Sequence, residues 1–285
     1  MTEPNSDTKN DDAFDPRELE AIKDKVPISA PAIFESIRRK GIEELNRPIS
    51  ALVLSALVAG LALGFSVLAE ALFRHHLPDA EWRPLVENFG YSVGFLIVIL
   101  GQMQLFTENT ITAVCPVLDT PSGSSLFKLC RLWSLVLIFN LIGASIFGYV
   151  LYATRGFQPE IWFAILDLSR HATSFPWGET MLRGIGAGWL IAALVWIMPN
   201  AEDSRPILII LITYLIALAD FSHVIAGTTE AAALVFSGDI SLGAAAFSFV
   251  APAFFGNILG GTVFFTVLTW VQIRTELAEK ERTAR

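Results

Sequence analysis

Two short polar segments interrupt otherwise apolar runs, and they hold the side chains best suited to chemistry. The first segment is Gln102-Met-Gln-Leu-Phe-Thr-Glu-Asn-Thr110, and the second is Asp220-Phe-Ser-His-Val-Ile-Ala-Gly-Thr-Thr-Glu230. His223 is the one histidine within an apolar run, and imidazole can exchange a proton near neutral pH. Thr107 offers a hydroxyl that can donate a hydrogen bond to a solute or to the imidazole ring. These residue types predict proton exchange and hydrogen bonding with a small solute.

The elements that carry these segments are typical of a membrane protein. Of the 285 residues, 53% are hydrophobic and 17% are charged, and the mean hydropathy is +0.53. A soluble domain carries roughly 25% charged residues, so this composition excludes a soluble enzyme. The net charge is −8, and the chain has no basic block of the kind that binds nucleic acid. We therefore expect the lipid bilayer as a partner, and no nucleic acid.

Six membrane spans are predicted, because a helix needs about 20 apolar residues to cross the hydrocarbon core. They lie at residues 50–72, 89–118, 126–152, 180–198, 207–236 and 250–273. The tails and the loops 119–131 and 199–206 hold 15 of the 20 Lys and Arg residues, which favours a cytoplasmic location for both termini. The predicted fold class is all-α integral membrane, with six transmembrane helices.

The same patterns divide the chain into four parts. Residues 1–28 are predicted to be a disordered acidic cytoplasmic tail, because they are polar and lack the apolar core of a signal peptide. Residues 29–47 are predicted to form an amphipathic helix on the cytoplasmic face. Its apolar residues recur at roughly helical spacing: Ile33, Phe34, Ile37, Ile42 and Leu45. Residues 48–273 form the six-helix channel domain, and residues 274–285 form a cytoplasmic C-terminal tail.

An internal repeat relates the two halves of the chain. Asn140-Leu-Ile-Gly143 in the third span matches Asn257-Ile-Leu-Gly260 in the sixth at an offset of 117 residues, and nearly the same offset relates the two polar segments. Three spans followed by three have opposite orientations, so we predict an inverted 3+3 repeat with broken second and fifth helices. Non-helical backbone at membrane depth lines a cavity or is buried in protein, which makes the breaks the expected pore elements. Asn140 and Asn257 would brace the breaks by hydrogen bonds, or would simply mark close helix packing.

Four polar residues near the breaks have two interpretations each. An ionisable group at mid-membrane is costly unless it faces a cavity or a partner, so His223 is more readily explained by function than by structure. Thr107 contacts the solute or caps the second half-helix. Glu230 lies in a vestibule at the mouth of its half-helix or caps that helix. Arg183 reaches the membrane interface or attracts anions in a vestibule.

The sequence argues against catalysis. Asp220, Ser222 and His223 are too close along the chain to form a Ser–His–Asp relay, because each side chain would point in a different direction. No nucleophile elbow, metal motif or Gly-rich phosphate loop accompanies them. Cys115 and Cys130 suggest neither a disulfide framework nor a metal site. We expect a protein that is not an enzyme and that binds no cofactor and no metal.

At these residues the chain resembles the formate/nitrite transporter family. The resemblance rests on Leu105-Phe-Thr107, on Phe221-Ser-His-Val-Ile-Ala226 and on the two Asn–Gly phrases, all in family order across residues 31–273. The phrases around Thr107 and His223 are most similar to a divergent branch that includes a bacterial inner-membrane protein. The resemblance implies a multi-pass protein of the bacterial inner (plasma) membrane. It also implies an aquaporin-like protomer with its own pore, assembled as a homopentamer.

The resemblance further implies roles for single residues in the pore. His223 and Thr107 match the family's central pair, which lies between two apolar constrictions. Tyr91, Phe95 and Ile216 fall where the family has constriction residues, with Tyr and Ile in place of Phe at two of these positions.

Three positions differ from the usual family pattern. Members that move formate usually carry a Lys in the vestibule before the fourth span, where this chain has Ala172 beside Arg170 and His171. Arg170 and His171 are therefore candidate vestibule residues. Ser222 replaces the usual acidic residue before the central His, and Gly227 replaces the usual Asn.

The leading hypothesis is a channel or secondary transporter for a small monovalent weak-acid anion of the formate or nitrite kind. A bare anion in an apolar constriction is costly, so the anion would gain a proton by way of His223 and cross as the neutral acid. One alternative is a pore for neutral small solutes, in which His223 and Thr107 only hydrogen-bond the cargo. Another is a non-conducting membrane scaffold or sensor whose cytoplasmic tails bind a partner.

Overall fold

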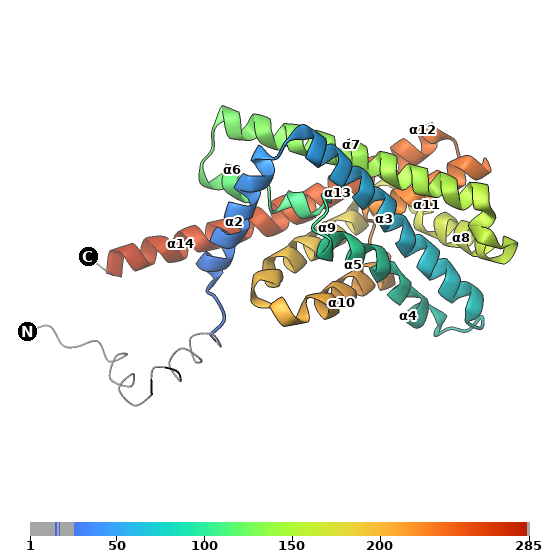
Figure 1. The fold of residues 1–285 in the computed structure, drawn as a ribbon, viewed down its shortest axis with the longest axis horizontal. Coiled ribbons are helices and arrows are strands. Elements are labelled where there is room, and N and C mark those ends of the chain that lie inside the picture. Colours follow the sequence, from blue (N-terminus) through green and yellow to red (C-terminus); the bar gives the residue numbers. More distant parts are fainter. Residues whose placement is uncertain (1–14, 16, 18–25, 284–285) are drawn as a thin grey trace, which may run out of the picture.

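A computed structural model describes residues 15, 17 and 26–283, and every regular element in that part of the chain is a helix (Figure 1). The predicted acidic tail at residues 1–28 lies mostly outside the described residues. The elements of the first half are α2 (Ala30–Asn46), α3 (Ile49–His76), α4 (Arg83–Glu87), η3 (Asn88–Tyr91), α5 (Ser92–Leu100), η4 (Glu108–Thr110), α6 (Cys115–Asp119), α7 (Gly123–Thr154) and η5 (Arg155–Phe157).

The second half continues in the same way, with two π-helical stretches, η8 and η9, near its end. Its elements are α8 (Pro159–Ala172), α9 (Trp177–Ile197), η6 (Met198–Asn200), η7 (Glu202–Ser204), α10 (Arg205–Leu218), α11 (Val224–Ser237), α12 (Leu242–Ala244), η8 (Ala245–Val250), α13 (Ala251–Ile258), η9 (Leu259–Val267) and α14 (Leu268–Thr283).

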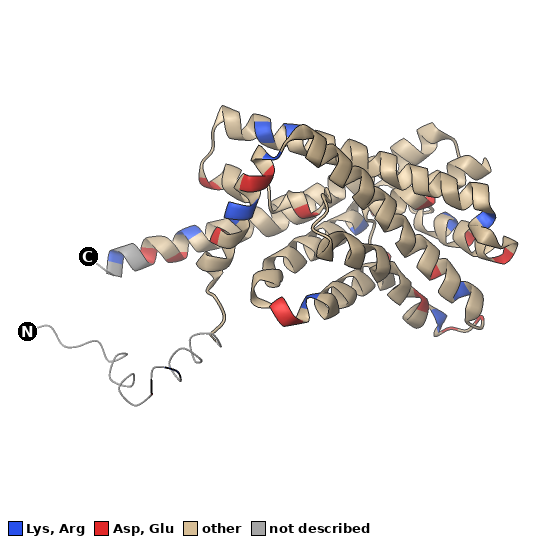
Figure 2. Ribbon diagram, viewed as in Figure 1, with Lys and Arg blue, Asp and Glu red and all other residues tan. Residues whose placement is uncertain are grey.

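Five helical stretches of the described chain are long and apolar enough to cross a membrane. They are Ile49–His76, Arg83–Leu100, Gly123–Phe157, Trp177–Asn200 and Leu242–Glu279. Charged side chains gather near helix ends and in α2 and α14, whereas long parts of α3 and α7 carry none (Figure 2). The chain is therefore an all-helical membrane protein.

The structure moves the start of one predicted span and divides the predicted second and fifth spans at the polar segments. The second predicted span, at 89–118, begins earlier, at Arg83, and its helix ends at Leu100. The fifth, at 207–236, is two helices of 14 residues each, α10 and α11, and neither alone reaches spanning length. The two interruptions fall at the polar segments of the sequence, whereas apolar residues on either side continue the hydropathy pattern.

Small residues allow the long helices to pack closely. A Cβ atom added to Gly60 of α3 would lie 2.2 Å from the carbonyl oxygen of Asn140 on α7. A Cβ atom added to Gly188 of α9 would lie at the same distance from the carbonyl oxygen of Asn257 on α13. Both helix pairs thus approach through a glycine beside an asparagine, which is the small-residue packing common in membranes.

The helix α2 lies against the helical body and beside α14 at one end of the molecule (Figure 1). It buries four of its five predicted apolar residues, Ile33, Phe34, Ile37 and Leu45, whereas Ile42 is 39% exposed. Hydrogen bonds from Arg38 and Arg39 to the Glu35 carboxylate lower the pKa of that group to about 2. The helix is therefore amphipathic, with an ion-paired polar face.

Candidate functional site

The two polar segments of the sequence are both places where helical structure stops. The backbone after α5 turns through a left-handed residue, Gln102, with φ of 52°. The backbone after α10 does the same at Asp220, also with φ of 52°. Residues 101–107 and 219–223, which we call the first and second breaks, leave backbone N–H and C=O groups without helical partners. Those groups must find other hydrogen bonds.

Asn140 satisfies part of the first break. Its Oδ1 accepts a hydrogen bond of 2.9 Å from the N–H of Phe106. Its Nδ2 donates to the carbonyl oxygens of Gln104 at 2.9 Å and Ala56 at 2.7 Å. This fully buried side chain therefore ties the first break to α3 and α7.

Asn257 makes the equivalent bonds at the second break. Its Oδ1 accepts from the N–H of Val224 at 2.9 Å, and its Nδ2 donates to the carbonyl oxygens of Ser222 and Gly184, each at 2.9 Å. The N–H groups that donate to the two asparagines belong to Phe106 and Val224, which are 118 positions apart. The asparagines themselves are 117 positions apart. The asparagines thus have the geometry of braces for the breaks.

The breaks meet through two side chains. Thr107 Oγ1 lies 2.8 Å from His223 Nε2, and both residues are almost completely buried. His223 is also the N-cap of α11, where its Nδ1 accepts a hydrogen bond of 3.3 Å from the N–H of Ala226. An accepting Nδ1 leaves the ring proton on Nε2, so that Nε2–H donates to Thr107 Oγ1. The Thr107 hydroxyl proton is then free to donate to a third group.

This arrangement bears on the two interpretations of Thr107. The Thr107 side chain makes no capping hydrogen bond to the turn η4 that follows it. The side chain that does cap a helix is that of His223, at the start of α11. The sequence predicted a hydrogen bond between Thr107 and His223 as one of several possibilities, and the structure contains this bond.

The predicted constriction residues surround the histidine. The ring of Phe95 meets the His223 ring edge-on, with 5.0 Å between centroids, and the Tyr91 ring lies 5.1 Å from that of Phe95. Phe95 and Ile216 are fully buried and Tyr91 nearly so. The central pair therefore has an apolar and aromatic surround.

A cavity of about 330 Å³ reaches His223 from one side, and we call it the His223 cavity. Five of the predicted site residues line it: Tyr91, His171, Ile216, His223 and Glu230. Ala172 is also in its wall, so the position where the family usually has a lysine contributes only a methyl group here. Gly227 lines it too, and a Cβ on Gly227 would lie 2.1 Å from the Phe249 ring.

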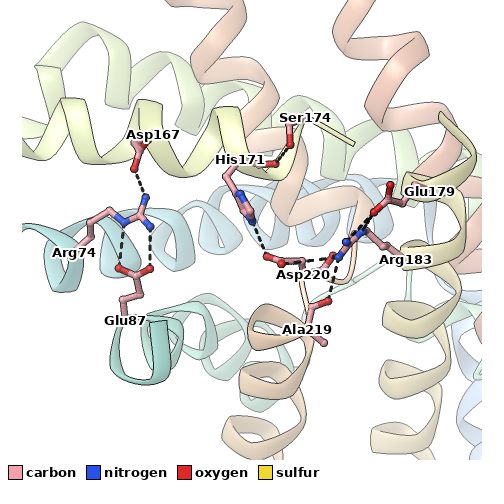
Figure 3. A network of polar contacts seen from close by, with 9 residues as sticks. All are labelled: Arg74, Glu87, Asp167, His171, Ser174, Glu179, Arg183, Ala219 and Asp220. Atoms are coloured by element: carbon pink, nitrogen blue, oxygen red, sulfur yellow. Dashed lines mark hydrogen bonds and ion pairs between the residues drawn. The ribbon is translucent and has the colours of Figure 1, made fainter. Parts of the chain in front are cut away.

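Two predicted vestibule residues lie elsewhere. Arg170 is paired with Asp239 at 2.6 Å and is not part of the cavity wall. Arg183 is also absent from the wall, but it donates hydrogen bonds to the backbone oxygens of Ala219 and Asp220 in the second break (Figure 3). Arg183 thus supports the break, and Arg170 pairs with Asp239 at the surface, while a vestibule role for either residue stays a prediction.

The rim of the His223 cavity holds ion pairs, several of which Figure 3 shows. Arg74 of α3 bridges Glu87 and Asp167. His171 of α8 lies 3.0 Å from Asp220. These contacts join α3, α4, α8 and the second break.

One buried residue of this wall was not among the predicted site residues. Glu70 is 6% exposed and lines the His223 cavity. It is the one charged residue of the predicted span 50–72. Intramembrane carboxyl groups are rare and usually functional, so that position alone was the signal that could have identified it.

A second cavity, of about 500 Å³, lies on the α2 side of the molecule, and we call it the Lys40 cavity. Its wall includes Lys40, Gln102, Glu108 and Arg205 and shares no residue with the His223 cavity. Lys40 Nζ donates to Gln102 Oε1 at 3.1 Å, so α2 contacts the first break. Among the described residues, no group of three or more His, Cys, Asp and Glu is arranged to hold a metal ion.

Comparison with known proteins decides the family. A profile described as "Formate/nitrite transporter" matches residues 31–271. The chain belongs to the formate/nitrite transporter family. The inner membrane protein YfdC of Escherichia coli (strain K12) is 38% identical to it over 93% of this chain and 86% of that relative. A probable formate transporter of Methanothermobacter thermautotrophicus is 22% identical over 78% of this chain and 89% of that relative.

Solved structures share the fold of this family member. An "FNT family ion channel" superposes with a TM-score of 0.71 at 19% identity, covering 85% of this chain and 98% of that chain. A "Pentameric formate channel with formate bound" gives a TM-score of 0.67 at 20% identity, covering 78% and 96%. The resemblance predicted from the residues is confirmed. A member of the formate/nitrite transporter family is a membrane transport protein and not an enzyme.

Proposed function

We propose that the chain forms a pore through which a small monovalent weak-acid anion, of the formate or nitrite kind, crosses the bilayer together with a proton, by way of the Thr107–His223 pair. The observation that carries this proposal is the 2.8 Å contact between Thr107 and His223. It joins the two breaks deep in the protein, and a cavity ends on it from one side. A solved relative described as a formate channel with formate bound supports the choice of solute.

The chemistry follows from the low polarity around this pair. Phe95 and Ile216 are fully buried beside it, so a bare anion would lose its water without gaining a charged partner. A neutral acid avoids most of that cost. The free Thr107 hydroxyl proton and the start of α11 both present positive charge to the anion as it arrives.

The proposal includes the architecture expected from sequence. Six crossings would form an inverted 3+3 repeat with helices broken at α5 and between α10 and α11, and the matching bonds of Asn140 and Asn257 support this symmetry. The four-part division of the chain, an inner-membrane location and cytoplasmic termini on the side of α2 and α14 belong to the same proposal. A homopentamer is supported by the relative described as pentameric.

The test is solute uptake by the purified full-length protein in proteoliposomes. Wild type and His223→Ala are compared for formate, nitrite, acetate and a neutral solute of similar size across pH 5 to 8. We expect formate or nitrite uptake that is faster at low external pH, with about a hundredfold loss in His223→Ala, since positioned groups that orient or transfer a proton contribute factors of this order.

Other outcomes would point to the alternatives. Equal anion uptake by wild type and His223→Ala without pH dependence would exclude this mechanism. Flux of the neutral solute that does not depend on pH, together with no anion flux, would favour a neutral-solute pore. No flux of any solute would favour a scaffold or sensor, although two separate cavities next to the breaks argue for conduction.

A further inference from the structure

The charges on the wall of the His223 cavity do not balance. The titratable residues of this wall are Glu70, Glu87, Asp220, Glu230, Arg74, His171, His223 and Tyr91. Arg74 is ion-paired with Glu87, and His171 is paired with Asp220. Two carboxyl groups are left, those of Glu70 and Glu230, and we call them the carboxyl pair.

Both members of the carboxyl pair are more than nine-tenths buried. Glu70 on α3 is 6% exposed and Glu230 on α11 is 8% exposed. Neither accepts a hydrogen bond or forms an ion pair with any residue that the structure describes. A buried carboxylate without a partner is strongly disfavoured, and such a group is held as the neutral acid instead.

The arginine that faces the carboxyl pair, Arg74, is already paired with Glu87 and Asp167. From α3 and α4 come the paired Arg74 and Glu87, from η3 the Tyr91 phenol, from α8 His171, and from the second break Asp220 and His223. No lysine lines the cavity among the described residues, because Ala172 stands where the family usually places one. An arriving anion therefore meets two carboxyl groups that must be neutral if it is to enter.

His223 is a poor proton source in this geometry. Its Nδ1 accepts from the Ala226 N–H, so protonation of Nδ1 would break the cap of α11. The imidazolium would also lie at the positive end of that helix. The ring can polarise a solute through Thr107 without giving up its own proton.

We propose that Glu70 and Glu230 are proton donors, which hand a proton to the anion in the His223 cavity before it reaches the Thr107–His223 pair. This inference rests on the proposed function. The carboxyl O–H bond breaks and a new O–H bond forms on the anion, which leaves a glutamate carboxylate and the neutral acid. The neutral acid moves on, and a proton from the bulk solution on the cavity side restores the glutamic acid. One proton and one anion cross per cycle.

The experiment uses formate uptake by the full-length protein in proteoliposomes at external pH 5.5 and 7.5. The variants are Glu70→Gln, Glu230→Gln and the double variant, because Gln keeps the size of Glu and cannot donate a carboxyl proton. Glu160→Gln is the matched control, since Glu160 is exposed on α8 and does not line the cavity. Size-exclusion profiles check that each variant is folded.

We expect the double variant to lose at least about tenfold in flux at pH 7.5 relative to wild type. At pH 5.5 the loss shrinks to about twofold, since bulk protons then protonate more of the solute directly. Glu160→Gln follows wild type at both pH values. A double variant whose flux ratio to wild type is the same at both pH values would overturn the proposal, and so would a monovalent-cation conductance that the substitutions abolish.

A second readout does not depend on transport. Infrared spectra of wild type near neutral pH should contain a carbonyl-stretch band of protonated carboxyl groups, and part of that band should be missing in the double variant. An unchanged band overturns the donor role. If wild type carries no anion, the proposed function fails, while the infrared result still decides whether the carboxyl pair holds protons.

Discussion

At the scale of single residues, the Thr107–His223 contact fixes which hydrogen is available to a solute. The Ala226 N–H occupies His223 Nδ1, and His223 Nε2–H is directed at Thr107 Oγ1. The one mobile proton of the pair is then that of the Thr107 hydroxyl. In the proposed mechanism, threonine is therefore the contact to the solute and histidine is the group that orients the threonine.

Removal of the Thr107 hydroxyl should therefore slow transport without disturbing the fold. Thr107→Val keeps the shape of the side chain but loses both the bond from His223 and the bond to the solute. A lost hydrogen bond of about 1.4 kcal/mol corresponds to about a tenfold loss in formate flux. Thr107→Ser keeps the hydroxyl and should retain more flux than Thr107→Val in the same proteoliposome assay. Equal fluxes for the two variants would contradict this role.

At the scale of elements, the breaks are stable because each has its own asparagine. Asn140 and Asn257 each make three hydrogen bonds to the backbone, two of them to groups at a break and one to a neighbouring helix. Both side chains are fully buried, so water cannot replace these bonds. A change at either position leaves buried polar backbone without a partner.

We expect Asn140→Ala and Asn257→Ala to destabilise the protein by similar amounts, about 3 kcal/mol each, because buried groups are left unsatisfied. The measurement is the denaturation midpoint of the detergent-solubilised protein. Asn46→Ala is the control, since Asn46 is exposed and its loss should change stability by less than about 0.5 kcal/mol. If one asparagine variant behaved like the control, the two breaks would not be equivalent.

Much of the fold and of the candidate site could be predicted from the sequence, and there is a physical reason why the rest could not. Apolar length predicted the spans, and the polar segments together with the repeat predicted where the helices stop and which asparagines lie near them. The exact ends of α5 and α10 could not be predicted, because apolar residues such as Leu100 and Leu218 continue the pattern to the last helical turn. The place of Glu70 in the cavity wall and the pairing of Arg170 with Asp239 could not be predicted either. Both depend on which helices meet in the fold, and local sequence patterns do not contain that information.

At the scale of the whole molecule, the protomer has apolar surface that must be covered by lipid or by another copy. Large apolar side chains are exposed along several long helices, among them Leu54, Phe65, Ile138, Ile146, Leu182, Phe247 and Phe255. Exposed apolar side chains in such number mark a membrane or subunit contact. It is consistent with the homopentamer proposed above.

Native mass spectrometry in mild detergent should therefore detect a species of five times the 31.2 kDa chain. A charged substitution on such a surface, for example Phe255→Glu, is expected to reduce the pentamer if that face contacts a neighbouring subunit, and to leave the mass unchanged if it faces lipid. A wild-type protein that is a monomer under all mild conditions would contradict the pentamer.

The contact between Gly227 and Phe249 constrains how this protein can vary during evolution. Any side chain at position 227 would occupy the space of the Phe249 ring, so neither residue can change alone without a clash or a void. The two positions should therefore covary among relatives: those with a larger residue at 227, such as the asparagine usual in the family, should carry a smaller one at 249. In this chain the glycine therefore leaves room for the aromatic ring of Phe249 in the cavity wall.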